Sequence, residues 1–154
     1  MMKQYQRILV GVEALEGVTH NAFEEACSIA KANDAALIIA FVMDKNGYAM
    51  LERTDPRGFA QLKNEAVTKL KEYEEEAVKQ GITDVQAVLE VGAPAKMLVQ
   101  DLCQKHKTDL IIIGQTGGTK IDQLLLGNKS KKIQKKSACE VKVVSGNTTS
   151  TVHV

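Results

Sequence analysis

Four of the 11 glycines of this chain lie close together, at Gly114, Gly117, Gly118 and Gly127. The first ends a strongly apolar run, and the last opens a segment that continues with residues 128–130, Asn-Lys-Ser. Glycine lets a backbone approach a ligand closely and adopt positive φ, and a helix N-terminus offers unpaired N–H groups to a phosphate. The spacing therefore predicts either a phosphate-binding loop or ordinary turn chemistry, and it matches neither GxxxxGK[ST] nor GxGxxG.

Five short, mostly apolar runs predict β-strands at 7–13, 35–42, 84–90, 109–114 and 138–144. Runs that are apolar at successive positions are typical of strands covered on both faces, as in a parallel sheet. The last run alternates between apolar and polar residues more than the others do. That alternation indicates an edge strand or a less covered position.

Amphipathic patterns between these runs predict helices at 19–33, 57–80, 95–106 and about 127–136. Gly81 stands where a glycine commonly ends a helix, and Pro94 precedes the third helix near a position that proline tolerates. Residues 43–57 contain two turn signals, Asn-Gly and Asp-Pro. This segment is expected to be a flexible surface loop that covers a site.

The alternation of strands and helices predicts an α/β fold. We expect a single-domain, open five-stranded parallel sheet with helices on both faces, in a Rossmann-like arrangement. Residues 1–146 make up the domain, and residues 147–154 are expected to be a frayed polar tail. Ligands of such sheets bind outside the carboxyl ends of the strands, which is where this order places Gly114.

The composition excludes several classes of protein. The 154 residues include 20 Lys+Arg and 19 Asp+Glu, for a net charge of +1, whereas a dedicated nucleic-acid binder usually carries a basic excess. The longest apolar runs are too short to span a membrane, and the first ten residues do not resemble a signal peptide. Cys27, Cys103 and Cys139 are far apart in sequence and are expected to be small buried thiols in a reducing cytoplasm.

Basic residues surround the last glycines. The chain carries six lysines here, with no acid among the last five, at Lys120, Lys129, Lys131, Lys132, Lys135 and Lys136. One interpretation is a solvated basic helix face. The other is that Lys129, together with Lys120, raises the affinity for phosphate.

Residues 111–130 resemble the nucleotide-binding signature of the universal stress protein family. That signature is a glycine, two residues, a glycine, nine residues, a glycine and then Ser or Thr, and Gly114, Gly117 and Gly127 match its spacing. Three further segments resemble the opening strand, the entry to the third helix and the closing strand of the family, at 8–13, 90–94 and 137–144. The resemblance covers nearly the whole chain.

The resemblance implies an adenine nucleotide alpha hydrolase-like fold that binds ATP, with or without Mg²⁺, or another adenine nucleotide. It implies that Gly11, Val12 and Glu13 flank the base and ribose, that Val42 contacts the adenine, and that Ile113 forms a wall of the pocket. It assigns the phosphates to Gly114, Gly117, Gly127, Asn128, Lys129 and Ser130.

Three residues depart from the family pattern. Glu13 stands where Asp is usual, Gly11 where Pro is frequent, and Asn128 where the signature has Ser or Thr. Asparagine can still cap a helix and donate to a phosphate oxygen. The open functions are an ATP-binding stress-response module or switch, an interaction protein of the same fold that binds no nucleotide, and a slow ATP hydrolase.

Residues for catalysis are few. His20, His106 and His153 are scattered and are expected at the surface. Glu13 and Asp44 lie near expected strand ends and could hold Mg²⁺ through water. Because no general base stands out, the sequence favours a binding module over an efficient ATPase.

The last apolar run also predicts assembly. Val141, Val143 and Val144 form a short β-prone segment near the end of the chain, and an edge strand with open N–H and C=O groups can pair with another chain. The family resemblance implies that two such strands pair in a homodimer. We therefore expect a homodimer, without nucleic-acid or membrane partners, that Val143→Asp would weaken.

Overall fold

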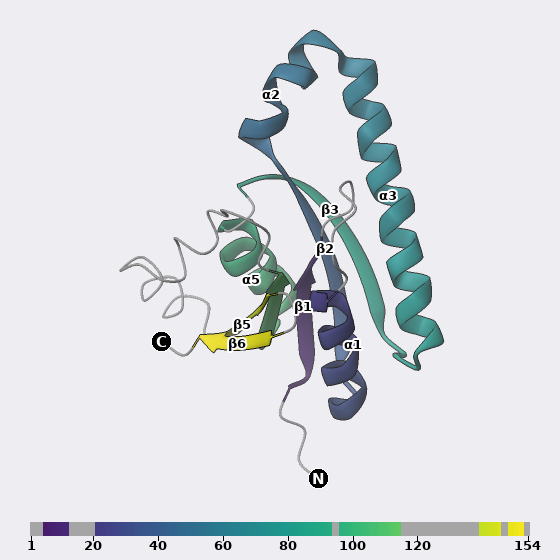
Figure 1. The fold of residues 1–154 in the computed structure, drawn as a ribbon, viewed down its shortest axis with the longest axis vertical. Helices are drawn as coiled ribbons and strands as arrows, with labels where there is room; N and C mark the ends of the chain where they lie inside the picture. The colour runs from purple at the N-terminus through teal and green to yellow at the C-terminus, as the bar shows by residue number, and fades with distance from the viewer. Residues whose placement is uncertain (1–4, 13–20, 94–95, 115–138, 146–147, 153–154) are drawn as a thin grey trace.

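The apolar runs of the sequence assemble into one sheet. A computed structural model of the chain describes residues 5–12, 21–93, 96–114, 139–145 and 148–152. Within these residues the strand order is β3-β2-β1-β4-β5-β6 (Figure 1). The strands are β1 (Arg7–Gly11), β2 (Ala36–Asp44), β3 (Val85–Gly92), β4 (Leu110–Gly114), β5 (Glu140–Ser145) and β6 (Thr148–Val152). The first five are parallel, which confirms the predicted parallel α/β sheet.

Helices cover both faces of this sheet. The described helices are α1 (Asn21–Asn33), α2 (Lys45–Thr54), α3 (Pro56–Lys79), the π-helical segment η1 (Met97–Leu102) and its continuation α5 (Cys103–His106). Buried residues of α1 and α3 pack on one face, and those of η1 and α5 pack on the other. Figure 1 shows α1 and α3 on the opposite side of β1 from α5. The predicted helix near 127–136 lies outside the described residues.

Alternation along the central strands divides the core into two layers. Ile8 and Val10 of β1 join the layer under α1 and α3, whereas Leu9 joins the layer under η1 and α5. The same division holds in β4, where Ile111 and Ile113 lie in the second layer. Burial of each such side chain contributes roughly 1.5–3 kcal/mol, so strands with both faces covered anchor the fold.

The expected surface loop at 43–57 is instead a helix. Asp44 caps α2 by accepting a hydrogen bond from the backbone N–H of Asn46 at 3.0 Å. Tyr48 packs its ring on Phe59 of α3, with 6.2 Å between ring centroids. These contacts override the turn tendency of the Asn-Gly pair, and the chain turns only at Asp55, whose carboxylate accepts the N–H of Gly58.

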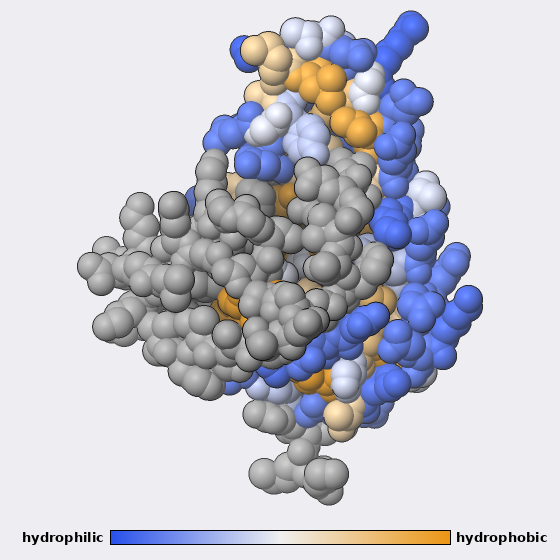
Figure 2. All heavy atoms as spheres, viewed as in Figure 1, coloured by the Kyte–Doolittle hydropathy of each residue, from blue (hydrophilic) through white to orange (hydrophobic). Residues whose placement is uncertain are grey.

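The helical pair α2 and α3 extends past the carboxyl end of the sheet, at the top of Figure 1. Figure 2 shows hydrophobic residues gathered in this upper region between hydrophilic neighbours. Met50 of α2 is among the exposed large hydrophobic residues, while Leu51 packs against the first core layer. No helix of the described residues is long and apolar enough to cross a membrane.

The end of α3 confirms the predicted role of Gly81. Gln80 caps the helix, and Gly81 follows with a φ of +104°. Its N–H donates to the carbonyl of Val78 at 3.0 Å. Glycine is favoured here because an L side chain rarely adopts this backbone conformation.

The expected frayed tail is also corrected. Thr148–Val152 form β6, which pairs antiparallel with β5 from Val141↔Val152 to Ser145↔Thr148. The segment is polar, but its threonines and valine are β-branched residues that favour strands. As a result, β5 is an inner strand of the sheet, and β6 occupies the edge that the sequence assigned to β5.

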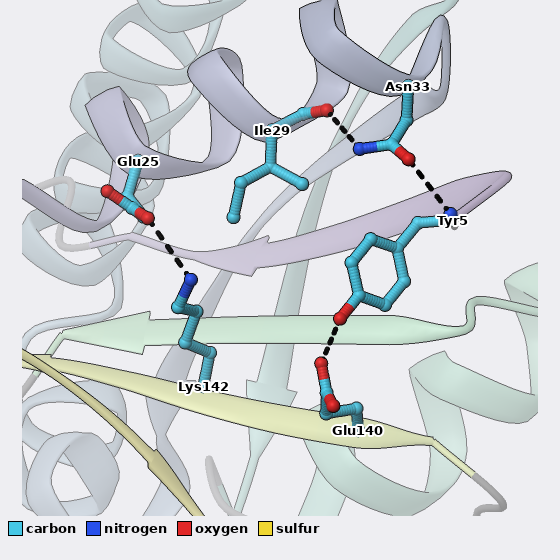
Figure 3. Close-up of polar contacts among 6 residues, drawn as sticks. All are labelled: Tyr5, Glu25, Ile29, Asn33, Glu140 and Lys142. Atoms are coloured by element: carbon cyan, nitrogen blue, oxygen red, sulfur yellow. Dashed lines mark hydrogen bonds and ion pairs between the residues drawn. The ribbon is translucent and has the colours of Figure 1, made fainter. Parts of the chain in front are cut away.

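The alternation in the last apolar run is explained by polar contacts beneath α1 (Figure 3). Lys142 Nζ lies 3.2 Å from Glu25 Oε1 of α1. The hydroxyl of Tyr5 donates to Glu140, and the backbone N–H of Tyr5 donates to Asn33 Oδ1. Burial, together with the hydrogen bond to Glu140, raises the pKa of Tyr5 to about 12. The polar side chains of β5 therefore connect α1 and the N-terminal segment to the sheet through an ion pair and a hydrogen bond.

Asp109 connects the amino ends of the central strands β1 and β4, and its loss should destabilise the fold. Its two carboxylate oxygens accept the backbone N–H groups of Gln6 at 2.8 Å and Arg7 at 3.1 Å. We expect Asp109→Ala to lower the free energy of unfolding in urea by about 1–3 kcal/mol, because two backbone donors lose their partner. Asp109→Asn keeps one acceptor oxygen and should lose less. Equal stability of all three proteins would contradict this role.

Candidate functional site

The strand order reverses beside β1, which makes this the switch point of the sheet. The chain runs from β1 to β2 and β3 on one side and then crosses to β4 on the other side. Gly11 at the end of β1 is aligned with Ala40 of β2 and with Ile113 of β4. In open α/β sheets, ligands bind outside the carboxyl ends of the strands at such a point. The structure therefore brings Gly11, Ile113 and Gly114 to the expected edge.

Gly11 permits a close approach between β1 and η1. A Cβ atom at this position would lie 2.9 Å from Leu98 Cδ1 and 3.0 Å from Ile113 Cγ2. Both distances are tighter than ordinary van der Waals contact. Val42 and Ile113 are buried in the same layer as Leu98, so these predicted site residues share one face of the sheet.

The predicted residues Val12 and Gly114 face the other layer. Val12 donates its N–H to the carbonyl of Ala40 at 2.8 Å, and its side chain packs against the layer of α1 and α3. A Cβ on Gly114 would lie 3.6 Å from Ala22 Cβ, in the first turn of α1. The side chains of the predicted site residues are thus divided between the two faces of the sheet. Their backbones lie together at its carboxyl edge.

The ends of β2 and β3 complete the described part of this edge. Asp44 is aligned with Gly92, and a Cβ on Gly92 would overlap the sulfur of Met97. The carboxylate of Asp44, suggested by the sequence as a Mg²⁺ holder, instead caps α2. No group of three or more His, Cys, Asp or Glu residues that could hold a metal occurs within the described part of the chain.

Sequence reasoning missed two residues of this edge, Met97 and Leu98. Leu98 belongs to the amphipathic pattern of the predicted helix at 95–106, which indicated only a buried face, and Met97 was not part of that pattern. The structure places Leu98 over Gly11 and Met97 over Gly92. The signal that could have found them is the pair of glycines at the ends of β1 and β3, since each leaves room for a large side chain from η1.

Several predicted site residues lie outside the described residues. They are Glu13, Gly117, Gly127, Asn128, Lys129 and Ser130, together with the neighbouring lysines at 120, 131, 132, 135 and 136. Their assignment to ribose and phosphate therefore stays a prediction from the sequence pattern.

His106 is a correction to the expectation that every histidine lies at the surface. It is 9% exposed, at the end of α5, and its Nε2 makes no hydrogen bond within the described structure. Its backbone carbonyl accepts Arg7 Nε at 2.6 Å. Burial, reinforced by the charges of Lys105 and Arg7 and opposed by Glu90, lowers the pKa of His106.

This lowered pKa predicts acid sensitivity. The stability that depends on neutral His106 is fully present above the unfolded pKa of about 6.5 and is lost as the pH falls from there through the folded pKa. We expect His106→Leu to flatten the decline of unfolding free energy between about pH 7.5 and 5. Urea titrations at several pH values measure this slope. Identical slopes for parent and variant would show that His106 does not carry the effect.

These features define an open, doubly wound α/β protein whose candidate site lies at the switch point of the sheet. The family model of the universal stress protein family matches residues 4–145. The chain therefore belongs to the universal stress protein family, as the resemblance in its sequence predicted.

Individual relatives agree with this assignment. A Staphylococcus haemolyticus protein named as a universal stress protein is 31% identical over 143 residues, which are 93% of this chain and 86% of the relative. A Staphylococcus aureus protein named in the same way is 32% identical over the same shares of the two chains.

Solved structures of the family are also similar. A universal stress protein in complex with cAMP is 29% identical, with a TM-score of 0.60 over 92% of this chain and 97% of the other. The universal stress protein UspA from Lactobacillus plantarum is 25% identical, with a TM-score of 0.65 over 91% of this chain and 97% of the other.

Proposed function

We propose that this chain is a stress-response protein that binds an adenine nucleotide, ATP in particular, as a binding module or switch. The observation that carries the proposal is the spacing of Gly114, Gly117 and Gly127. The first of these glycines is the last residue of β4, at the carboxyl end of the strand. This strand lies beside β1 at the switch point, where open α/β sheets bind their ligands.

Two further points support an adenine nucleotide. The family member that is 29% identical was solved in complex with cAMP. In this chain, Lys129 and Lys120 add positive charge to the glycine segment, and lysine is a common partner of phosphate. We assign the phosphates to the segment from Gly114 to Ser130, and the base and ribose to the ends of β1 and β2.

Within this proposal, Gly11, Val12 and Glu13 flank the base and ribose, and Val42 contacts the adenine. Ile113 supports the wall of the site from within the second core layer, since it is almost fully buried. When Mg²⁺ accompanies ATP, the metal supplies charge neutralisation between phosphates. We propose that the carboxylate oxygen of Asp44 that does not cap α2 contacts such an ion through water.

Isothermal calorimetry with ATP, in the presence and absence of Mg²⁺, tests the proposal. A parallel titration with cAMP separates recognition of adenosine from recognition of the β- and γ-phosphates. We expect ATP to bind more tightly than cAMP, because the lysine-rich segment then meets more phosphate charge. The absence of both heat and a thermal shift at millimolar ATP would overturn the proposal.

The alternative is an interaction protein of this family that binds no nucleotide. It is favoured by the three departures Gly11, Glu13 and Asn128 from the family pattern. Heating the purified protein and measuring adenine absorbance in the supernatant addresses it. Released adenine nucleotide would exclude the alternative.

We also propose a homodimer, with the β5–β6 side of the sheet as the seam. In the protomer the outer edge of β5 pairs with β6, so β6 offers the open backbone groups on this side. Sedimentation velocity at tens of micromolar should show a dimer, and a monomer at that concentration would contradict the proposal.

A further inference from the structure

Two cysteines that are far apart in the sequence meet at the amino edge of the sheet. Cys103 begins α5, and Cys139 directly precedes β5. Both are buried, with 3% and 5% of their surfaces exposed, and both belong to the second core layer. This location is at the opposite end of β4 from the candidate nucleotide site.

Both thiols donate a hydrogen bond to the same backbone carbonyl. The Cys139 thiol donates to the carbonyl oxygen of Thr108, with an Sγ–O distance of 3.3 Å. The Cys103 thiol donates to the same oxygen at 3.6 Å. The two side chains are close enough that each thiol alters the ionisation of the other. Their side chains therefore converge on one point, as the short sulfur–sulfur bond of a disulfide requires.

We propose that Cys103 and Cys139 form a redox-active dithiol that a hydroperoxide converts into an intramolecular disulfide. The thiolate of one cysteine attacks the peroxide, the O–O bond breaks, and a sulfenic acid and hydroxide form. The sulfur of the second cysteine then attacks the sulfenic sulfur, and the S–S bond forms as water leaves. In total, two thiols and one hydrogen peroxide give one disulfide and two waters.

Ionisation of the pair favours this reaction. When one thiol loses its proton, the other can donate a hydrogen bond to the thiolate. This hydrogen bond from Cys139 is the main reason that the pKa of Cys103 is lowered. The same hydrogen bond and burial raise the pKa of Cys139. A thiolate is the nucleophile in thiol oxidation, so the cysteine of the pair that loses its proton is the one that reacts first.

The third cysteine provides an internal comparison. Cys27 lies in α1, in the other core layer, and burial raises its pKa to about 11. It should therefore remain a thiol under conditions that oxidise the pair.

The disulfide would close a loop of the chain that contains the glycine motif. Residues 103 and 139 enclose the whole sequence from Gly114 to Ser130 that carries the glycine motif. A cross-link that closes a loop restricts the unfolded chain. We expect oxidation to raise the melting temperature by roughly 5–10 °C.

The test treats the intact protein with hydrogen peroxide, alkylates the remaining thiols in denaturant and identifies tryptic peptides by mass spectrometry. The expected product links peptide 97–105 to peptide 137–142, loses two hydrogens and is reversed by dithiothreitol. A second arm uses urea below the unfolding midpoint, where local opening admits peroxide to buried thiols.

Three matched variants complete the experiment. Cys103→Ser and Cys139→Ser each keep a hydroxyl that can donate to the Thr108 carbonyl, and each should abolish the linked peptide and the rise in melting temperature. Cys27→Ser should retain both. Alkylation of all three parental thiols in both arms would overturn the proposal, and so would a link that involves Cys27 or joins two chains.

Discussion

Gly117→Val is expected to weaken ATP binding at least tenfold. The substitution adds three heavy carbons where the family signature brings the backbone against the phosphates, and it disfavours positive φ. Each charge-assisted hydrogen bond to phosphate contributes about 1.5–3 kcal/mol, and 1.4 kcal/mol corresponds to a factor of ten in affinity. Calorimetry of parent and variant measures the change, and urea titration checks that the variant remains folded.

Gly81→Val is the matched control for this experiment. Gly81 has a φ of +104° at the end of α3, and nothing lies within 4 Å of a Cβ built there. A valine at this position should therefore lower stability through backbone strain of about 1–2 kcal/mol. It precedes β3, at the amino edge of the sheet, and should leave ATP affinity nearly unchanged. Equal affinities for Gly117→Val and the parent would mean that the glycine segment is only a turn.

Val143→Asp is expected to lower the free energy of unfolding by about 3–5 kcal/mol. Val143 is 7% exposed and is aligned with Ile113 inside the second core layer. An aspartate there buries a carboxylate among apolar side chains. This corrects the expectation that Val143→Asp would act on a dimer seam alone, because the protomer itself should lose stability.

The control for this substitution is Val91→Asp on the edge strand β3. Val91 is 37% exposed, so the same change there leaves the carboxylate in contact with water. Its effect should stay within about 0.5 kcal/mol. Urea unfolding of parent and both variants measures the difference, and similar losses for the two variants would contradict the burial of Val143.

The layered sheet could be predicted from the sequence because its signals are local. The apolar runs of β1, β2 and β4 and the stripe of α3 each follow the period of their own element. By contrast, α2 depends on tertiary contact, since Tyr48 packs on Phe59 across the chain turn at Asp55. Such contacts are not visible in a local pattern of residues.

The features that escaped prediction depend on contacts between segments and not on the residue pattern within one segment. β6 is polar, and its strand character depends on the edge of β5 beside it. Cys103 and Cys139 lie together at the amino ends of β4 and β5, where both thiols donate to the carbonyl of Thr108. At the site, the glycine spacing in the sequence indicated the carboxyl edge. The packing of Met97 and Leu98 on that edge could not be predicted, because it depends on how η1 crosses the sheet.

A crystal structure with bound ATP tests the central claim most directly. We predict that the phosphates lie against the backbone between Gly114 and Ser130, with Gly117, Gly127 and Lys129 in contact, and that the adenine lies beside Gly11, Val12 and Val42. No nucleotide at millimolar ATP, or a nucleotide at the amino edge near Asp109, would contradict the account.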